Sequence, residues 1–117
     1  MNPAAADFSI REASLSDLKV LVQIIRESFA DVALRFGLNK ANCPRHPSNC
    51  TSEWVESALE KGVTYFLMAK NGAPCGCVAI ERADRKVCYL ERLAVLPKYR
   101  KCGCGRALVD YALSWAW

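Results

Sequence analysis

The residues of this sequence best suited to bind an anion stand in a short basic turn that runs from Lys98 to Arg106. Gly103 and Gly105 lack the Cβ atoms that would keep a ligand away from backbone N–H groups. An apolar strand precedes the turn and an apolar-periodic helix follows it, so the turn ends at a helix N-terminus. Free N–H groups and the helix dipole favour negative charge there. The pattern therefore predicts a phosphate-binding turn.

The positive charge of the chain is concentrated in this turn. The sequence has 16 Lys and Arg against 12 Asp and Glu, a net charge of +4. Four of the basic residues lie in the turn: Lys98, Arg100, Lys101 and Arg106. The rest of the chain therefore has 12 charges of each sign. A nucleic-acid-binding protein more often spreads basic residues over a whole face. We therefore expect a small phosphorylated ligand and no nucleic-acid partner.

The spacing of the glycines separates this turn from other phosphate-binding turns. It lacks the GxxxxGK[ST] pattern of a P-loop, and no third glycine completes the dinucleotide pattern GxGxxG. The segment Arg100-Lys101-Cys102-Gly103-Cys104-Gly105 instead resembles the R/Q-x-x-G-x-G/A signature of the GNAT N-acetyltransferase family. The preceding Leu93-Ala94-Val95, followed by Pro97, is similar to the fourth strand of that family and its exit. The order of strand, proline, loop and helix is also that of the family.

The resemblance implies a binding site for acetyl-CoA. In the family, the pantetheine amides pair with backbone at the edge of the fourth strand, and the pyrophosphate lies on the loop. The residues that would face the pantetheine arm are Leu93, Ala94 and Val95. The residues that would surround the pyrophosphate are Arg100, Lys101, Cys102, Gly103, Cys104, Gly105 and Arg106. The alternative interpretation is an ordinary strand–helix corner with solvated lysines.

Acetyl transfer to an amine also requires a group that removes a proton, because an amine with a pKa near 10 is charged at neutral pH. Glu91 occupies the place of the general-base glutamate in the histone-acetyltransferase branch of the family. Beside apolar residues its pKa would rise toward a useful value. Glu81, at the end of the neighbouring strand, is the second candidate. The alternative is that Glu91 pairs with a neighbouring arginine, and no residue matches the tyrosine that usually serves as general acid.

The loop between Cys43 and Cys50 contains the only histidine, His46. The resemblance places this loop beside the acceptor pocket, where His46 would bind substrate or carry a proton. Cys43, His46 and Cys50 are one ligand short of a closed zinc site, and their spacing matches no common finger. We therefore expect no metal. A proline-stiffened surface loop is the alternative.

The seven cysteines and the lack of an export signal predict free thiols in a reducing cytoplasm. Cys102 and Cys104 lie beside basic residues at a helix start, which would favour their thiolates. The alternative is that both are linker residues that contribute only their backbone to the turn. Cys75 and Cys77 alternate along a strand and are predicted to share one face as small hydrophobic residues. An aromatic stripe is predicted to be core or interface: Trp54, Tyr111, Trp115 and Trp117.

Periodicity, caps and turns predict the elements that position these residues. Strands are expected at 8–12, 63–70, 74–81 and 87–95, and helices at 15–29, 52–61 and 104–117. Ser14 and Asp17 match a capping box, and Asn71-Gly72 predicts a hairpin turn. Residues 30–36 either continue the first helix or form a second one. The predicted order is β-α-α-β-β-β-α, an α/β fold (α+β, mixed sheet).

The 117 residues are predicted to form a single domain that corresponds to the N-terminal two-thirds of the GNAT fold. The family continues with a further strand, a helix and a hairpin that this sequence lacks, so the fourth strand would leave an open sheet edge that favours homodimerisation. No apolar run approaches the roughly 20 residues of a membrane span, and no membrane partner is expected.

The resemblance implies transfer of an acetyl group from acetyl-CoA to a primary amine by direct attack. The acceptor stays open, because loops and the absent C-terminal part determine it. One alternative is a non-catalytic CoA-binding or interaction module. Another is a thiol or metal sensor built on the cysteines and His46.

Overall fold

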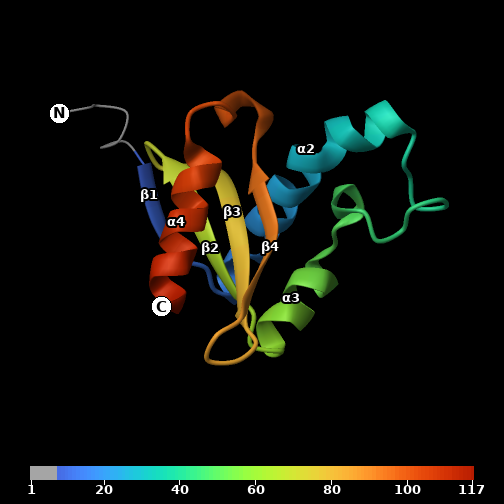
Figure 1. Cartoon of the computed structure of the whole chain (residues 1–117). Coiled ribbons are helices and arrows are strands. Elements are labelled where there is room, and N and C mark those ends of the chain that lie inside the picture. The colour runs from blue at the N-terminus through green and yellow to red at the C-terminus, as the bar shows by residue number, and fades with distance from the viewer. Residues whose placement is uncertain (1–7) are drawn as a thin grey trace.

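The fold is one four-stranded sheet with helices on both faces, in a computed structural model that describes residues 8–117 (Figure 1). All strand pairs are antiparallel, in the order β1-β2-β3-β4. The strands and α-helices are β1 (Phe8–Glu12), α2 (Leu18–Phe36), α3 (Ser52–Glu60), β2 (Thr64–Lys70), β3 (Ala73–Arg82), β4 (Cys88–Val95) and α4 (Cys104–Ala116). The predicted order of elements is confirmed.

Short 3-10 turns connect several of these elements. They are η1 (Leu15–Asp17), η2 (Pro47–Asn49) and η3 (Pro97–Tyr99). The predicted capping box is present at η1, where the Ser14 N–H donates to Asp17 Oδ2 at 2.9 Å. The Asn71-Gly72 hairpin is also present, with both residues at positive φ, as a two-residue hairpin turn requires.

Helix α2 continues without a break through residues 30–36. It ends at Gly37, whose φ of 65° lets the Leu38 N–H bond to the Ala33 carbonyl at 2.8 Å. The sequence left open whether a second helix begins here, and the structure shows one helix of 19 residues. None of the helices within residues 8–117 has the length and apolar character needed to cross a membrane.

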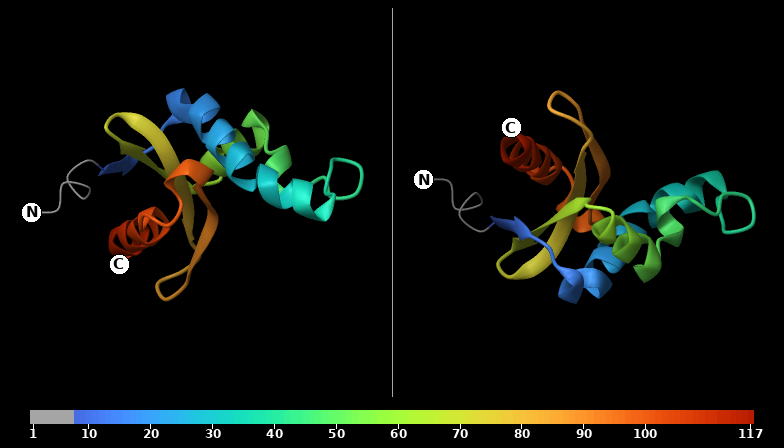
Figure 2. Two further views of the ribbon diagram at one scale, coloured as in Figure 1. Left: turned by 90° about the horizontal axis from the view of Figure 1, so that it is seen from above. Right: turned by 90° about the horizontal axis from the view of Figure 1, so that it is seen from below.

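The two faces of the sheet carry separate cores. Helices α2 and α3 cover one face and α4 covers the other (Figure 2). The core on the α2/α3 face includes Leu21, Ile25, Val55, Tyr65 and Cys77, and the core on the α4 face includes Phe66, Met68, Cys75, Cys104 and Leu108. Alternation along β2 and β3 assigns each strand residue to one core or the other.

A bulge in β3 breaks this alternation and corrects one prediction. Met68 pairs with Gly76 and Ala69 pairs with Pro74, so Cys75 is an extra residue on its strand. Cys75 therefore packs in the α4 core, whereas Cys77 packs in the α2/α3 core. The prediction that the two cysteines share one face is wrong.

The aromatic residues likewise divide between the two faces. Trp54 packs against the α2/α3 core. Tyr111 and Trp115 contact Phe66 on the opposite face, with ring centroids 5.1 and 5.5 Å away. The predicted single stripe is therefore two separate groups, because helices on opposite faces of the sheet supply its members.

Candidate functional site

A groove of about 300 Å³ lies between α2 and the last residues of β4. The residues that line it are Ser28, Phe29, Val32, Leu93, Ala94, Val95, Arg100 and Gly105. Five of these belong to the predicted set, and the three on α2 were not predicted. Their helical spacing predicts only a shared helix face. Their place in the groove depends on the contact between α2 and the end of β4, which is a tertiary contact (Figure 1).

The groove ends at the N-terminus of α4. Gly103 is the N-cap residue with φ 78° and ψ 8°, and no side chain caps this helix. Lys101 also adopts positive φ, at 68°. The first N–H groups of an α-helix have no partner within the helix, so this terminus can bind an anion.

The two glycines of the turn serve different purposes. A Cβ on Gly103 would meet nothing within 4 Å, so its positive φ is what requires glycine. Gly105 lies within α4, and a Cβ there would stand 4.0 Å from Val95 Cγ2, on the lining of the groove. The absent side chain of Gly105 therefore keeps the groove open.

Arg100 connects the turn to α2. Its Nη1 lies 2.7 Å from Asp31 Oδ2, its Nη2 donates to the Ser28 carbonyl, and its Nε donates to the Val95 carbonyl at 3.3 Å. This contact holds the pKa of Asp31 below its ordinary value, chiefly through the hydrogen bond from the guanidinium. Arg100 thus holds the two walls of the groove together.

The groove also contains an unsatisfied polar atom. Ser28 Oγ is buried and has no hydrogen-bond partner among residues 8–117. A buried hydroxyl without a partner costs free energy unless a ligand or water satisfies it. A polar ligand in the groove would meet the edge of β4 on one side and the α2 wall, which holds this buried hydroxyl, on the other.

Residues 23–117 match the sequence model of the Acetyltransferase (GNAT) family. The chain belongs to this family. The match includes the α2 wall, β4, the turn and α4, so the groove and the anion-binding terminus lie in the part that defines the family. Comparison with curated proteins gave no match.

Solved GNAT structures share this fold. The chain aligns with the PaiA N-acetyltransferase from Thermoplasma acidophilum in complex with coenzyme A at 18% identity and a TM-score of 0.71, covering 93% of this chain and 71% of that one. A GNAT acetyltransferase from Brucella melitensis in complex with acetyl-CoA gives 18% identity and a TM-score of 0.71, covering 93% and 68%. The ribosomal-protein-S18-alanine N-acetyltransferase from Escherichia coli gives 17% and 0.71, covering 93% and 59%.

The cysteines of the GNAT turn differ from each other. Cys102 is exposed, whereas Cys104 is buried against Cys75. Burial raises the thiol pKa of Cys104 and raises that of Cys75 to about 11. The expectation of a favoured thiolate is therefore wrong for Cys104, because desolvation outweighs the charges and the helix terminus nearby.

The two candidate bases lie outside the groove lining. Glu91 is exposed on β4 and pairs with Ala79, directly before Arg92. Glu81 pairs with Tyr89, four residues and roughly 13 Å along β4 from Leu93. Position along the strand thus favours Glu91 over Glu81.

His46 has a structural role in the loop before α3. Its Nδ1 caps η2 by accepting from the Ser48 N–H at 3.2 Å, and it also lies 2.8 Å from Ser48 Oγ. The ring meets Phe29 edge to face, with centroids 6.1 Å apart. Within residues 8–117, no group of three or more His, Cys, Asp or Glu side chains is arranged to hold a metal ion.

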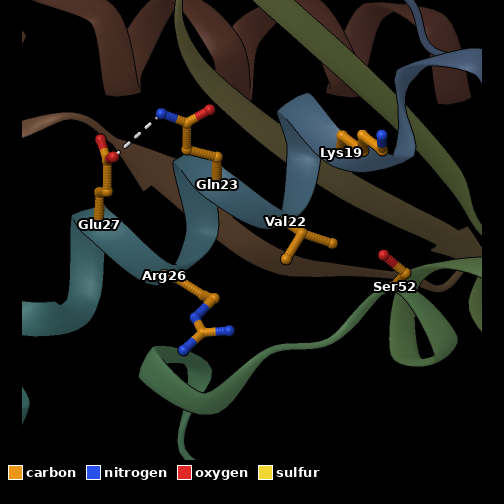
Figure 3. Close-up of a pocket in the computed structure, with 6 residues that line it drawn as sticks. All are labelled: Lys19, Val22, Gln23, Arg26, Glu27 and Ser52. Atoms are coloured by element: carbon orange, nitrogen blue, oxygen red, sulfur yellow. Dashed lines mark hydrogen bonds between the residues drawn. The ribbon is translucent and has the colours of Figure 1, made fainter.

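A further depression of about 350 Å³ lies on the outer face of α2 (Figure 3). Its charged and polar lining includes Lys19, Gln23, Arg26 and Glu27 from α2 and Ser52 from α3. Gln23 Nε2 donates to Glu27 Oε1 at 3.1 Å, and Arg26 points toward the segment that precedes α3. These residues share no member with the groove, and nothing in their arrangement resembles a reactive site.

Proposed function

We propose that this protein is an acetyl-CoA-dependent N-acetyltransferase that acetylates a primary amine by direct attack. The observation that carries the proposal is the groove between α2 and β4 that ends at the uncapped N-terminus of α4. Membership of the GNAT family and a groove that leads to an anion-binding terminus both support acetyl-CoA as the ligand. The free cysteines of residues 8–117 suit a reducing cytoplasm, where we propose the protein works.

The turn and the groove would divide the binding of the cofactor. The N–H groups from Lys101 to Arg106 would bind the pyrophosphate, and Arg106 would add charge from the exposed face of α4. The outer edge of β4, from Leu93 to Val95, would pair with the pantetheine amides. Acetyl-CoA supplies the activated thioester. The protein positions it and excludes water along the α2 wall.

Glu91 is our proposed base for the amine proton. Glu91 lies two residues from Leu93 along β4, on the side away from the turn. The acyl end of an extended ligand would lie there. In Glu91→Gln we expect kcat to fall at least tenfold near neutral pH, with CoA affinity retained. An unchanged rate and pH profile would exclude Glu91 from this role.

Calorimetry and a CoA-release assay together test the proposed function. Binding of CoA to the folded state should raise the melting temperature by several degrees at a hundredfold excess over Kd. Release of free CoA in the presence of an amine would demonstrate transfer. Binding without release across a broad amine panel would instead identify a non-catalytic CoA-binding module. Absence of binding to folded protein would overturn the proposal.

We also propose that the protein self-associates through β4. Among the described strands, β4 lies at the end of the sheet. Tyr89 and Leu90, in the half of β4 away from the proposed pantetheine contacts, are 54% and 39% exposed. Open strand edges with apolar side chains recruit further chains. Sedimentation should show a concentration-dependent dimer, and a monomer throughout the high micromolar range would contradict this.

A further inference from the structure

A third hollow, of about 250 Å³, lies beside the groove and is lined by Arg45, Trp54 and Arg92. Three separate segments supply these residues: the loop before α3, the first turn of α3, and β4. We call it the arginine hollow. Two guanidinium groups and one aromatic ring in a hollow of this size form a site for a small anionic group.

A bulge in β4 directs Arg92 into the hollow. Cys77 pairs with Ala94 and Ala79 pairs with Glu91, so Arg92 and Leu93 together stand opposite a single residue of β3. Arg92 adopts φ 49°, in the left-handed region that non-glycine residues seldom occupy. Such strained positions concentrate at functional sites.

The face of Trp54 holds the Arg92 guanidinium, with Cζ 5.5 Å from the ring centroid. A guanidinium held over an aromatic ring keeps N–H donors available for a further ligand. The ion pairs found within residues 8–117 involve Arg11, Arg100 and Arg106, so neither arginine of the hollow has a carboxylate within 4.0 Å there. Glu91, which directly precedes Arg92, also forms no ion pair with either arginine of the hollow.

The hollow adjoins the groove at two points. Arg92 of the hollow is followed directly by Leu93 of the groove. Arg45 is followed by His46, whose ring packs on Phe29 of the groove. The contact lies at the end of the groove away from the α4 N-terminus, where the proposed function places the acyl group and Glu91.

We propose that the arginine hollow selects an acceptor whose amine is joined to a carboxylate, as in a small amino acid. This inference rests on the proposed function for the position of the amine. Arg45 and Arg92 bind the carboxylate through paired N–H donors, and Trp54 packs on the short carbon chain. The same two charges repel polyamines and other polycationic acceptors.

Matched acceptors test the proposal. β-Alanine and β-alaninamide carry the same amine and differ in the carboxylate. We expect kcat/KM for β-alanine to exceed that for the amide at least tenfold, mainly through KM, and spermidine to be the poorest acceptor. Arg92→Gln and Arg45→Gln should bring the ratio toward one, and Arg92→Lys should restore it only in part. Arg85→Gln, in the exposed β3–β4 turn, is the matched control and should keep the ratio. Equal use of acid and amide, or preference for spermidine, would overturn the proposal.

A binding measurement separates this inference from the proposed function. Titration of the folded protein with β-alanine should shift the NMR signal of the Trp54 indole, and β-alaninamide should shift it far less. The shift should disappear in Arg92→Gln. A selective shift without CoA binding would retain the hollow and overturn the proposed function, whereas CoA binding without any selective shift would overturn the hollow.

Discussion

The two ends of the candidate site on β4 differ in the groups that form them: backbone at the turn and side chains at the bulge. At the turn, backbone N–H groups and two glycines form the surface. At the bulge, long arginine side chains from distant segments form it. A backbone site depends on local geometry and accepts one kind of ligand, here an anion. A side-chain site changes with single substitutions. We infer that the turn fixes the cofactor and that the bulge adjusts the acceptor.

The largest effect should come from Gly103→Val, which tests whether backbone geometry governs the turn. Valine resists the φ of 78°, at a cost of about 1–3 kcal/mol, and would displace the first N–H groups of α4. The melting shift on CoA addition should disappear. Gly72→Val, at φ 82° in the remote hairpin, is the matched control: it should lower stability yet keep the shift. Equal loss of binding in both variants would mean that strain alone is responsible.

Gly105→Val should have the next largest effect and tests the open groove without strain. This position is helical, so the added side chain is tolerated by the backbone but fills the space beside Val95. We expect the Kd for CoA to rise by about tenfold to a hundredfold, equivalent to ~1.4–2.8 kcal/mol, while the melting temperature of the free protein hardly changes. Ala107→Val, on the exposed part of α4, is the control. Calorimetry provides the readout.

Arg100→Ala tests whether the α2 wall supports the turn. Loss of the contacts to Asp31 and Ser28 should lower the melting temperature by a few degrees and weaken CoA binding only a few-fold, because the pair is half exposed and screened. The pKa of Asp31 is lowered in the folded state, so its stabilisation is present above its ordinary pKa and is lost as pH falls through the lowered value. That acid dependence should be absent in the variant and present in Arg85→Ala.

Asp17→Asn should have the smallest effect on the site and calibrates the others. A hydrogen bond from Arg11, followed by one from the Ser14 N–H, lowers the pKa of Asp17 from 3.8 to about 2. Its stabilisation is thus complete above pH 3.8 and is lost as pH falls toward 2. We expect a loss of about 1 kcal/mol near neutral pH, with unchanged CoA affinity. Altered CoA affinity would show that distant stability affects the groove.

The sequence predicted what depends on local signals. The Ser14–Asp17 box and the Asn71-Gly72 turn each lie where expected, because neighbouring residues form them. The turn and its glycines were predicted for the same reason. The bulges at Cys75 and Arg92 depend on pairing between strands, which alternation along one strand does not reveal. The α2 wall and the arginine hollow depend on contacts between distant segments.

The thiols of Cys75 and Cys104 lie in the core where α4 meets the sheet, and the two residues are 0% and 3% exposed. An alkylating reagent can reach them only when α4 separates from β3. The rate at which native protein becomes modified at these two positions therefore measures how often the helix opens. Because α4 supplies the terminus proposed to bind pyrophosphate, CoA should slow this modification. The modification rate of this pair therefore reports how often α4 opens, and its decrease on CoA addition would report occupancy of the proposed site.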